Sequence, residues 1–247
     1  LEFMMVEHHI IPPFTSTWWI GLIVSALVIW GIIQYGKSQS PKKEAQFSFI
    51  LGIVLILREI VREIYLYSIN TWHITDSLPL HLCGISSIIA GLILIYRNQF
   101  WLEFILILGI PGAVHSFLTP ELTHGHDAYL LFEYYFSHSG IILSGFYLVF
   151  VHRMSPRLGS WKNAFWVAQG LLIFIGLMNL ILKSNYMYLS KKPLVSNPLI
   201  IGEWPFYLLG FEIAGLVHIL LFYSFFIWVV KKNPAKVTIN KNGQSKI

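Results

Sequence analysis

Seven apolar stretches alternate with short polar segments along the chain, and each is near the length of a membrane-spanning helix. A helix of about 20 apolar residues crosses a hydrocarbon core that is about 30 Å thick. The stretches cover residues 17–35, 46–68, 78–96, 101–118, 129–151, 163–182 and 205–230. The pattern predicts an all-α fold, a polytopic membrane helical bundle of seven transmembrane helices. The count falls to six if the short fourth stretch, which contains Pro111, only re-enters the membrane.

These stretches predict a single domain. Residues 17–230 form the transmembrane bundle, residues 1–16 precede it, and residues 231–247 form a polar tail that we expect to be disordered. The first three residues, Leu-Glu-Phe, resemble a cloning remnant and are set aside.

Composition agrees with a lipid environment. Charged residues make up 12% of the chain and hydrophobic residues 55%, whereas a soluble domain has about 25% charged residues. The net charge of +5 comes from loops and the tail, without a basic patch typical of nucleic-acid binding, so no nucleic-acid partner is expected. The basic loops predict an N-terminus outside and a C-terminus inside, although Lys183, Lys191 and Lys192 fall on the outer side. We expect the bacterial cytoplasmic membrane.

Charged residues within a membrane span are costly and indicate either a structural or a functional role. The second stretch contains Arg58, Glu59, Arg62 and Glu63, at spacings that place them along one stripe of a helix. Two interpretations stay open. The stripe forms a self-neutralising ion-pair network, or an arginine binds the phosphate of a lipid headgroup.

The only cysteine, Cys83, lies at the beginning of the third stretch. Ser86, Ser87 and Ala90 follow it at helical spacing, which predicts a small, polar face inside the bundle. Asp76, Ser77 and Pro79 have the pattern of a helix start. Cys83 would then lie little more than a turn inside the helix. On that helix His81 points about 200° away from Cys83, so it is a poor base for the thiol.

The fifth stretch places Tyr134, Ser137 and His138 on one helix face, with Glu133 beside them. With the predicted orientation, nearly all intramembrane polar residues fall in one half of the bilayer: Arg62, Glu63, Cys83, His115, His138, Asn179 and Glu212. Unrelated structural residues would be scattered in depth. The grouping predicts one polar cavity that opens to one leaflet.

Four segments carry a family resemblance: LPLHLC at 78–83, FEYYFSHSG at 132–140, NYMYLSKKP at 185–193 and GEWPFY at 202–207. They resemble the bacterial integral-membrane family related to vertebrate transmembrane protein 164, over about residues 58–222. The androgen-induced fatty-acid-ester hydrolases are more distantly similar. The resemblance implies a polytopic lipid acyltransferase, with Cys83 as acyl carrier and His138 as its partner.

The leading hypothesis is therefore a membrane-embedded acyltransferase or acyl-ester hydrolase that forms a thioester on Cys83 with His138 as general base. The expected partner is a membrane phospholipid or another acyl lipid, with no cofactor and no metal ligand. The sequence does not indicate an oligomeric state. The residues expected to bind substrate or support the pair are Arg58, Arg62, Glu59, His81, Ser87, Tyr134, Glu133, Asn185, Trp204 and Glu212.

Two other function classes stay open. A metal-dependent membrane hydrolase would draw ligands from the loop residues Glu121, His124, His126 and Asp127, together with His115 or His138. A transporter or lipid-binding protein without catalysis would use the charged stripe as its substrate or coupling site.

Overall fold

The computed structural model describes residues 9–193 and 202–232. The predicted cloning remnant and nearly all of the predicted disordered tail lie outside these residues. The helices are α1 (Ser16–Ser38), α2 (Pro41–Ser68), α3 (Leu82–Ile95), α4 (Gln99–Phe104), α5 (Ile110–Leu118), α6 (Ala128–Phe150), α7 (Ser160–Leu182) and α8 (Tyr207–Lys232). A π-helical segment, η1 (Ile105–Gly109), joins α4 to α5, and a 3-10 turn, η2 (Tyr186–Tyr188), follows α7. Two short strands, β1 (His9–Ile10) and β2 (Glu121–Leu122), pair antiparallel, with His9 opposite Leu122.

The prediction of an all-α bundle is confirmed, because every apolar stretch contains a helix in the described part of the chain. Within residues 9–193 and 202–232, four helical segments are long and apolar enough to cross a membrane: Ser16–Ser38, Gln99–Leu118, Ser160–Leu182 and Tyr207–Lys232. Helix α3 is apolar but has only 14 residues.

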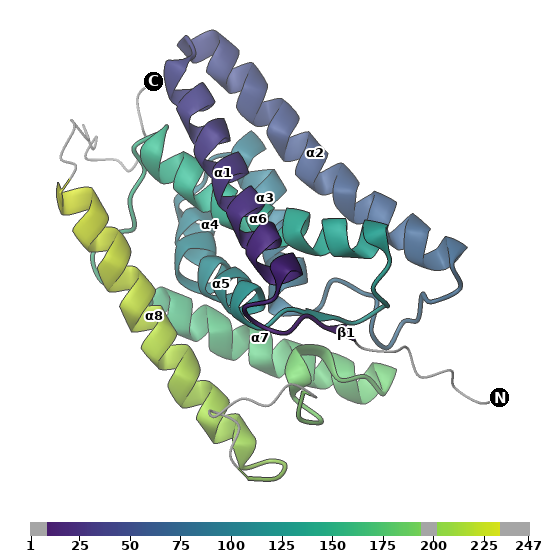
Figure 1. Ribbon diagram of the computed structural model, residues 1–247. Coiled ribbons are helices and arrows are strands. Elements are labelled where there is room, and N and C mark those ends of the chain that lie inside the picture. Colours follow the sequence, from purple (N-terminus) through teal and green to yellow (C-terminus); the bar gives the residue numbers. More distant parts are fainter. Residues whose placement is uncertain (1–8, 194–201, 233–247) are drawn as a thin grey trace.

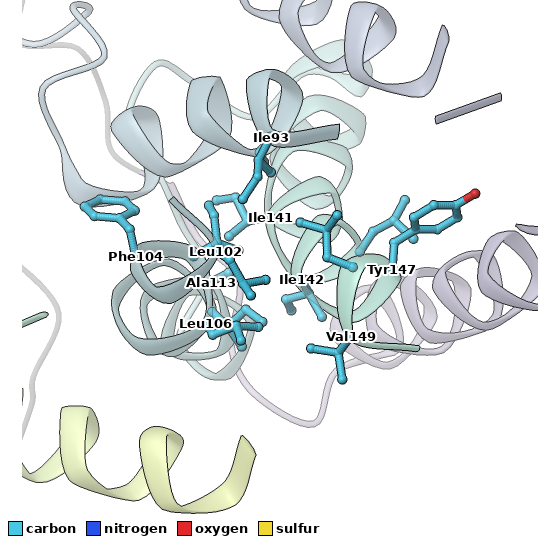
Figure 2. Packing of buried hydrophobic residues seen from close by; sticks show 14 of the residues in the cluster. Ile93, Leu102, Phe104, Leu106, Ala113, Ile141, Ile142, Tyr147 and Val149 are labelled. Carbon is cyan, nitrogen blue, oxygen red and sulfur yellow. The ribbon is translucent and has the colours of Figure 1, made fainter. Parts of the chain in front are cut away.

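The central element of the bundle is the α4–η1–α5 segment. Figure 1 shows α1 and α2 on one side of it and α7 and α8 on the other, with α3 and α6 between. Its side chains from Leu102 to Leu108 are buried. Figure 2 shows Leu102 and Leu106 near Ile141 and Ile142 of α6, in the main apolar core.

The π-helical turn of this segment has a local cause. The amide of Ile110 donates to the carbonyl of Ile105, five residues earlier instead of four. The next residue, Pro111, lacks an N–H and would clash with the preceding turn of a regular α-helix. A π turn widens the backbone at this point, so the helix continues to Leu118 and does not break. The fourth stretch is thus continuous over 20 residues, long and apolar enough to cross a membrane.

Glycines allow two helices of the core to approach closely. A Cβ on Gly91 of α3 would lie 2.8 Å from the carbonyl oxygen of Gly52 on α2, and a Cβ on Gly52 would lie 2.6 Å from that of Gly91. The backbones of α2 and α3 are therefore in contact. This contact holds the charged stripe of α2 beside the small face of α3, whose Ser86, Ser87 and Ala90 are buried as predicted.

The predicted start of the third helix was wrong. Helix α3 begins at Leu82 with His81 as its N-cap, and not at Asp76–Pro79. The Ser77 hydroxyl donates to the Asp76 carboxylate and accepts from the His73 amide, so it does not cap a helix. Cys83 is consequently the second residue of α3, closer to the N-terminus than expected.

Candidate active site

The structure brings Cys83 and His138 together. The two side chains lie close enough to interact and line the same cavity, although the residues come from α3 and α6. The hydroxyl of Ser116 on α5 lies 3.6 Å from the Cys83 sulfur and is a second polar neighbour. Cys83 is the only thiol of the chain, and it is partly buried.

The orientation of His138 leaves one ring nitrogen for the thiol. Its Nδ1 lies 2.6 Å from the carbonyl oxygen of Tyr134, one turn earlier on α6. A carbonyl can only accept, so Nδ1 carries the proton and a neutral ring has its lone pair on Nε2. The Tyr134 hydroxyl donates to the Ser116 carbonyl at 2.6 Å and thus connects α6 to α5. Backbone contacts therefore hold the imidazole in a base-competent form beside Cys83.

Two glycines allow close packing near the thiol. A Cβ on Gly112 of α5 would lie 3.4 Å from the Cys83 sulfur, in van der Waals contact with it. A Cβ on Gly84 would lie 2.8 Å from Cα of Pro79, because residues 77–81 fold back over the first turn of α3. Because Cys83 is in the first turn of α3, its sulfur lies near the partial positive charge of the helix N-terminus, which stabilises a thiolate.

A cavity of about 590 Å³ connects the thiol–imidazole pair with most of the predicted supporting residues. This volume is within the usual range of small-molecule sites. Its walls come from α2, α3, α5, α6, α7 and α8. The predicted site residues that line it are Arg58, Glu59, Arg62, His81, Cys83, Ser87, Glu133, Tyr134, His138 and Glu212.

The charged stripe of α2 forms an ion-pair network at one end of this cavity. Arg58 pairs with Glu133 of α6 at 2.5 Å and with Glu59 at 2.6 Å, and it also donates to Ser87. Arg62 pairs with Glu63 at 2.5 Å. The network holds two arginines and three glutamates, so the guanidinium groups are already neutralised. This arrangement matches the ion-pair interpretation of the stripe more closely than a free phosphate site.

The segment after α7 closes one end of the cavity. Tyr186 is fully buried, and its hydroxyl donates to the Ile74 carbonyl at 2.8 Å and accepts from the Leu78 amide at 3.0 Å. His81 faces this segment, because its Nδ1 accepts from the Met187 amide at 3.2 Å. His81 is the N-cap of α3 and not a helical residue, so the helix geometry from which its orientation was predicted does not apply.

Two predicted supporting residues organise this segment without lining the cavity. The Asn185 side chain accepts from the amides of Ser190 and Lys191 at 3.0 and 2.8 Å. Trp204 is 61% exposed, and its indole N–H donates to the Leu189 carbonyl at 3.1 Å. Glu212 does line the cavity, where it accepts from Gln169 of α7 at 2.8 Å.

The loop residues of the metal hypothesis do not converge. His124 contacts Ser77 at 3.1 Å and Asp76 at 3.5 Å, whereas Asp127 caps α6 by accepting from the Leu130 amide. His126 stacks on the ring of His9. Among the described residues, no three His, Cys, Asp or Glu side chains gather closely enough to hold a metal ion.

Asp76 and His124 instead join the loop between α2 and α3 to the loop after α5. Burial raises the pKa of Asp76, but the hydrogen bonds from His124 and Ser77 outweigh it and bring the pKa below its usual value. Asp76 is therefore ionised at neutral pH.

Two parts of the site were not predicted. Ser116 was missed, because one serine beside a histidine gives no periodic signal. His115 and His218 were noted as polar residues, but their direct contact at 2.8 Å between α5 and α8 was not expected.

Comparison with known proteins identifies the family. A model of the TMEM164 family matches residues 6–223, which is most of the chain. The chain belongs to the TMEM164 family. The match includes Cys83, His138 and every residue that lines the cavity. No curated protein and no solved structure matched the chain. The predicted relation to transmembrane protein 164 is confirmed, and this TMEM164-family chain, with its four long apolar helices, is an integral membrane protein.

Proposed function

We propose that the protein is a membrane-embedded lipid acyltransferase or acyl-ester hydrolase in which Cys83 carries the acyl group and His138 is its general base. One observation carries the proposal. The only thiol lies beside an imidazole that a backbone carbonyl orients, and both side chains line a cavity of about 590 Å³. A thiol with an adjacent, oriented base is the usual arrangement of a cysteine nucleophile.

The first half of the reaction forms the thioester. His138 Nε2 takes the thiol proton, and the sulfur of Cys83 attacks the carbonyl carbon of an acyl ester. The ester C–O bond then breaks, and His138 gives its proton to the departing alkoxide. An alcohol yields a new ester in the second half, and water yields a free fatty acid.

Backbone amides of α3 suit the charge that develops on the carbonyl oxygen. The N–H groups of Cys83 and Gly84 belong to the first turn of α3, where a helix offers no carbonyl partner. Neither group has a hydrogen-bond partner among the described residues. Two such amides next to a nucleophile stabilise an oxyanion, an effect of about 3–4 kcal/mol per donor.

The proposed substrate is a membrane phospholipid or another acyl lipid that enters the cavity from one leaflet. The basic loops favour the outer leaflet of a bacterial cytoplasmic membrane. The arginine–phosphate contact expected from the sequence has less support, since Arg58 and Arg62 already bind carboxylates.

The test is lipid turnover by purified protein in detergent–phospholipid micelles, with an isotope-labelled acyl chain on the donor. Cys83→Ala and His138→Ala are expected to lose acyl transfer and ester hydrolysis by at least about 100-fold. His126→Gln is the matched control, because His126 is exposed and does not line the cavity. Turnover that persists in Cys83→Ala would remove the nucleophile from the proposal. Absence of lipid turnover by the wild type, together with lipid movement across vesicles, would favour the transporter class.

A further inference from the structure

A second pair of imidazoles lines the cavity apart from Cys83 and His138. His115 of α5 and His218 of α8 approach each other with 2.8 Å between their Nε2 atoms. Both side chains are partly buried and line the same cavity as the thiol.

The hydrogen bonds fix the protonation of both rings. His218 Nδ1 lies 2.6 Å from the Ala214 carbonyl oxygen, so Nδ1 must carry the proton. The Nε2 of a neutral His218 is then an acceptor, and His115 Nε2 must donate to it. A neutral His115 therefore has its lone pair on Nδ1. This nitrogen has no hydrogen-bond partner among the described residues, and it is available as a base.

The position of His115 relates this base to the thiol. It precedes Ser116, whose hydroxyl lies 3.6 Å from the Cys83 sulfur, and it follows Gly112, where a Cβ would lie 3.4 Å from that sulfur. Gln169 and Glu212, from α7 and α8, add a polar patch to the same cavity. The cavity thus has one wall with the acyl carrier and another with a free base and hydroxyl-binding groups.

We infer that His115 is the base that activates the acyl acceptor, an alcohol, when it attacks the thioester on Cys83; this inference rests on the proposed function. His115 Nδ1 takes the hydroxyl proton, the alcohol oxygen bonds to the acyl carbon, and the C–S bond breaks. His115 then gives the proton to the departing sulfur, which restores the thiol and the neutral base. His138 serves the formation of the thioester, and His218 is a positioning residue that holds His115 in the required tautomer.

His115→Gln separates the base from the structural contact. The glutamine amide nitrogen can still donate to His218 Nε2, as His115 Nε2 does, but the variant has no basic nitrogen at the Nδ1 position. For the positioning residue, His218→Gln keeps an acceptor for His115, whereas His218→Leu removes it. His126→Gln is again the control.

The experiment measures the two half-reactions separately on purified full-length protein, with phospholipid as donor and a monoacyl lysophospholipid as acceptor. His115→Gln is expected to form the Cys83 thioester within about two-fold of the wild-type rate and to transfer it to the lysophospholipid about 100-fold more slowly, so the acyl-enzyme accumulates. Hydroxylamine, which needs no general base, is expected to release the acyl group equally fast from both proteins. His218→Leu should show the same accumulation, and His218→Gln should recover most of the transfer.

The outcomes distinguish the two proposals. A wild-type protein that never forms a thioester overturns the proposed function and this inference with it. A wild type that forms the thioester, together with a His115→Gln variant that transfers it at the wild-type rate, overturns only the inference and assigns both half-reactions to His138. Failure of His115→Gln to form the thioester also overturns the inference, because His115 would then act before the acceptor binds.

Discussion

The ion pair between Arg58 and Glu133 offers a quantitative test of how the charged stripe holds the bundle together. The two side chains are only 9% and 10% exposed, and their atoms lie 2.5 Å apart. Glu133→Gln removes one of the two carboxylates that neutralise the buried charge of Arg58. Loss of one partner of a buried pair costs about 3–5 kcal/mol. Arg58 keeps Glu59 at 2.6 Å, so we expect the low end of that range, about 3 kcal/mol.

The assay is thermal unfolding of the detergent-solubilised protein, followed by intrinsic tryptophan fluorescence. In a chain of this length about 3 kcal/mol corresponds to a fall in Tm of about 6–12 °C. Glu63→Gln is the matched control: its side chain is 28% exposed, and the expected loss is about 1 kcal/mol or less.

A double variant, Arg58→Gln with Glu133→Gln, replaces the ion pair by two amides that can still bond. It should lose less stability than the sum of the single variants. A Glu133→Gln protein that unfolds within about 1 °C of the wild type would refute the reasoning. The stripe would then be free for a role other than structure.

Two further predictions concern Gly84, which follows the thiol residue, and Asp76, in the loop before α3. Gly84→Ala forces the new Cβ to 2.8 Å from Pro79 Cα, so it should cost about 1–3 kcal/mol and reduce labelling of Cys83 by an acyl probe; labelling at the wild-type rate would contradict this. The lowered pKa of Asp76 makes its stabilising contribution complete above its usual pKa of 3.8 and lost as the pH falls through the lower folded value. The difference in Tm between wild type and Asp76→Asn should be present at pH 7 and shrink in acid below about pH 4; a difference that persists unchanged in strong acid would contradict it.

The apolar stretches predicted the helices well, because a helix that crosses a membrane must be apolar over about 20 residues. Helical periodicity then added the detail of one helix face. It placed the small face of α3 correctly, since Ser86 and Ser87 follow Cys83 at helical spacing and are buried. The start of α3 failed for a local reason: Ser77 has the residue type of a helix cap, but Asp76 and His124 occupy its hydroxyl. Whether a hydroxyl caps a helix or binds a distant loop depends on tertiary contacts.

The candidate site divides in the same way. The pairing of Cys83 with His138 was predicted from their similar depth in the membrane and from the family resemblance, and the fold brings the two residues together. The contacts of Asn185 and Trp204 with backbone carbonyls and amides of the segment after α7 depend on a turn geometry that their motifs do not reveal. The contact of His115 with His218 joins residues 103 positions apart. No spacing rule predicts such a pair.

The most direct test of the central claim is intact-protein mass spectrometry of the wild type after incubation with phospholipid micelles and no acceptor. The account predicts a mass increase of one acyl chain, located on Cys83, released by hydroxylamine, and absent in Cys83→Ala and His138→Ala. The account would be contradicted by acyl turnover without any adduct on Cys83, or by an adduct that forms equally fast in His138→Ala.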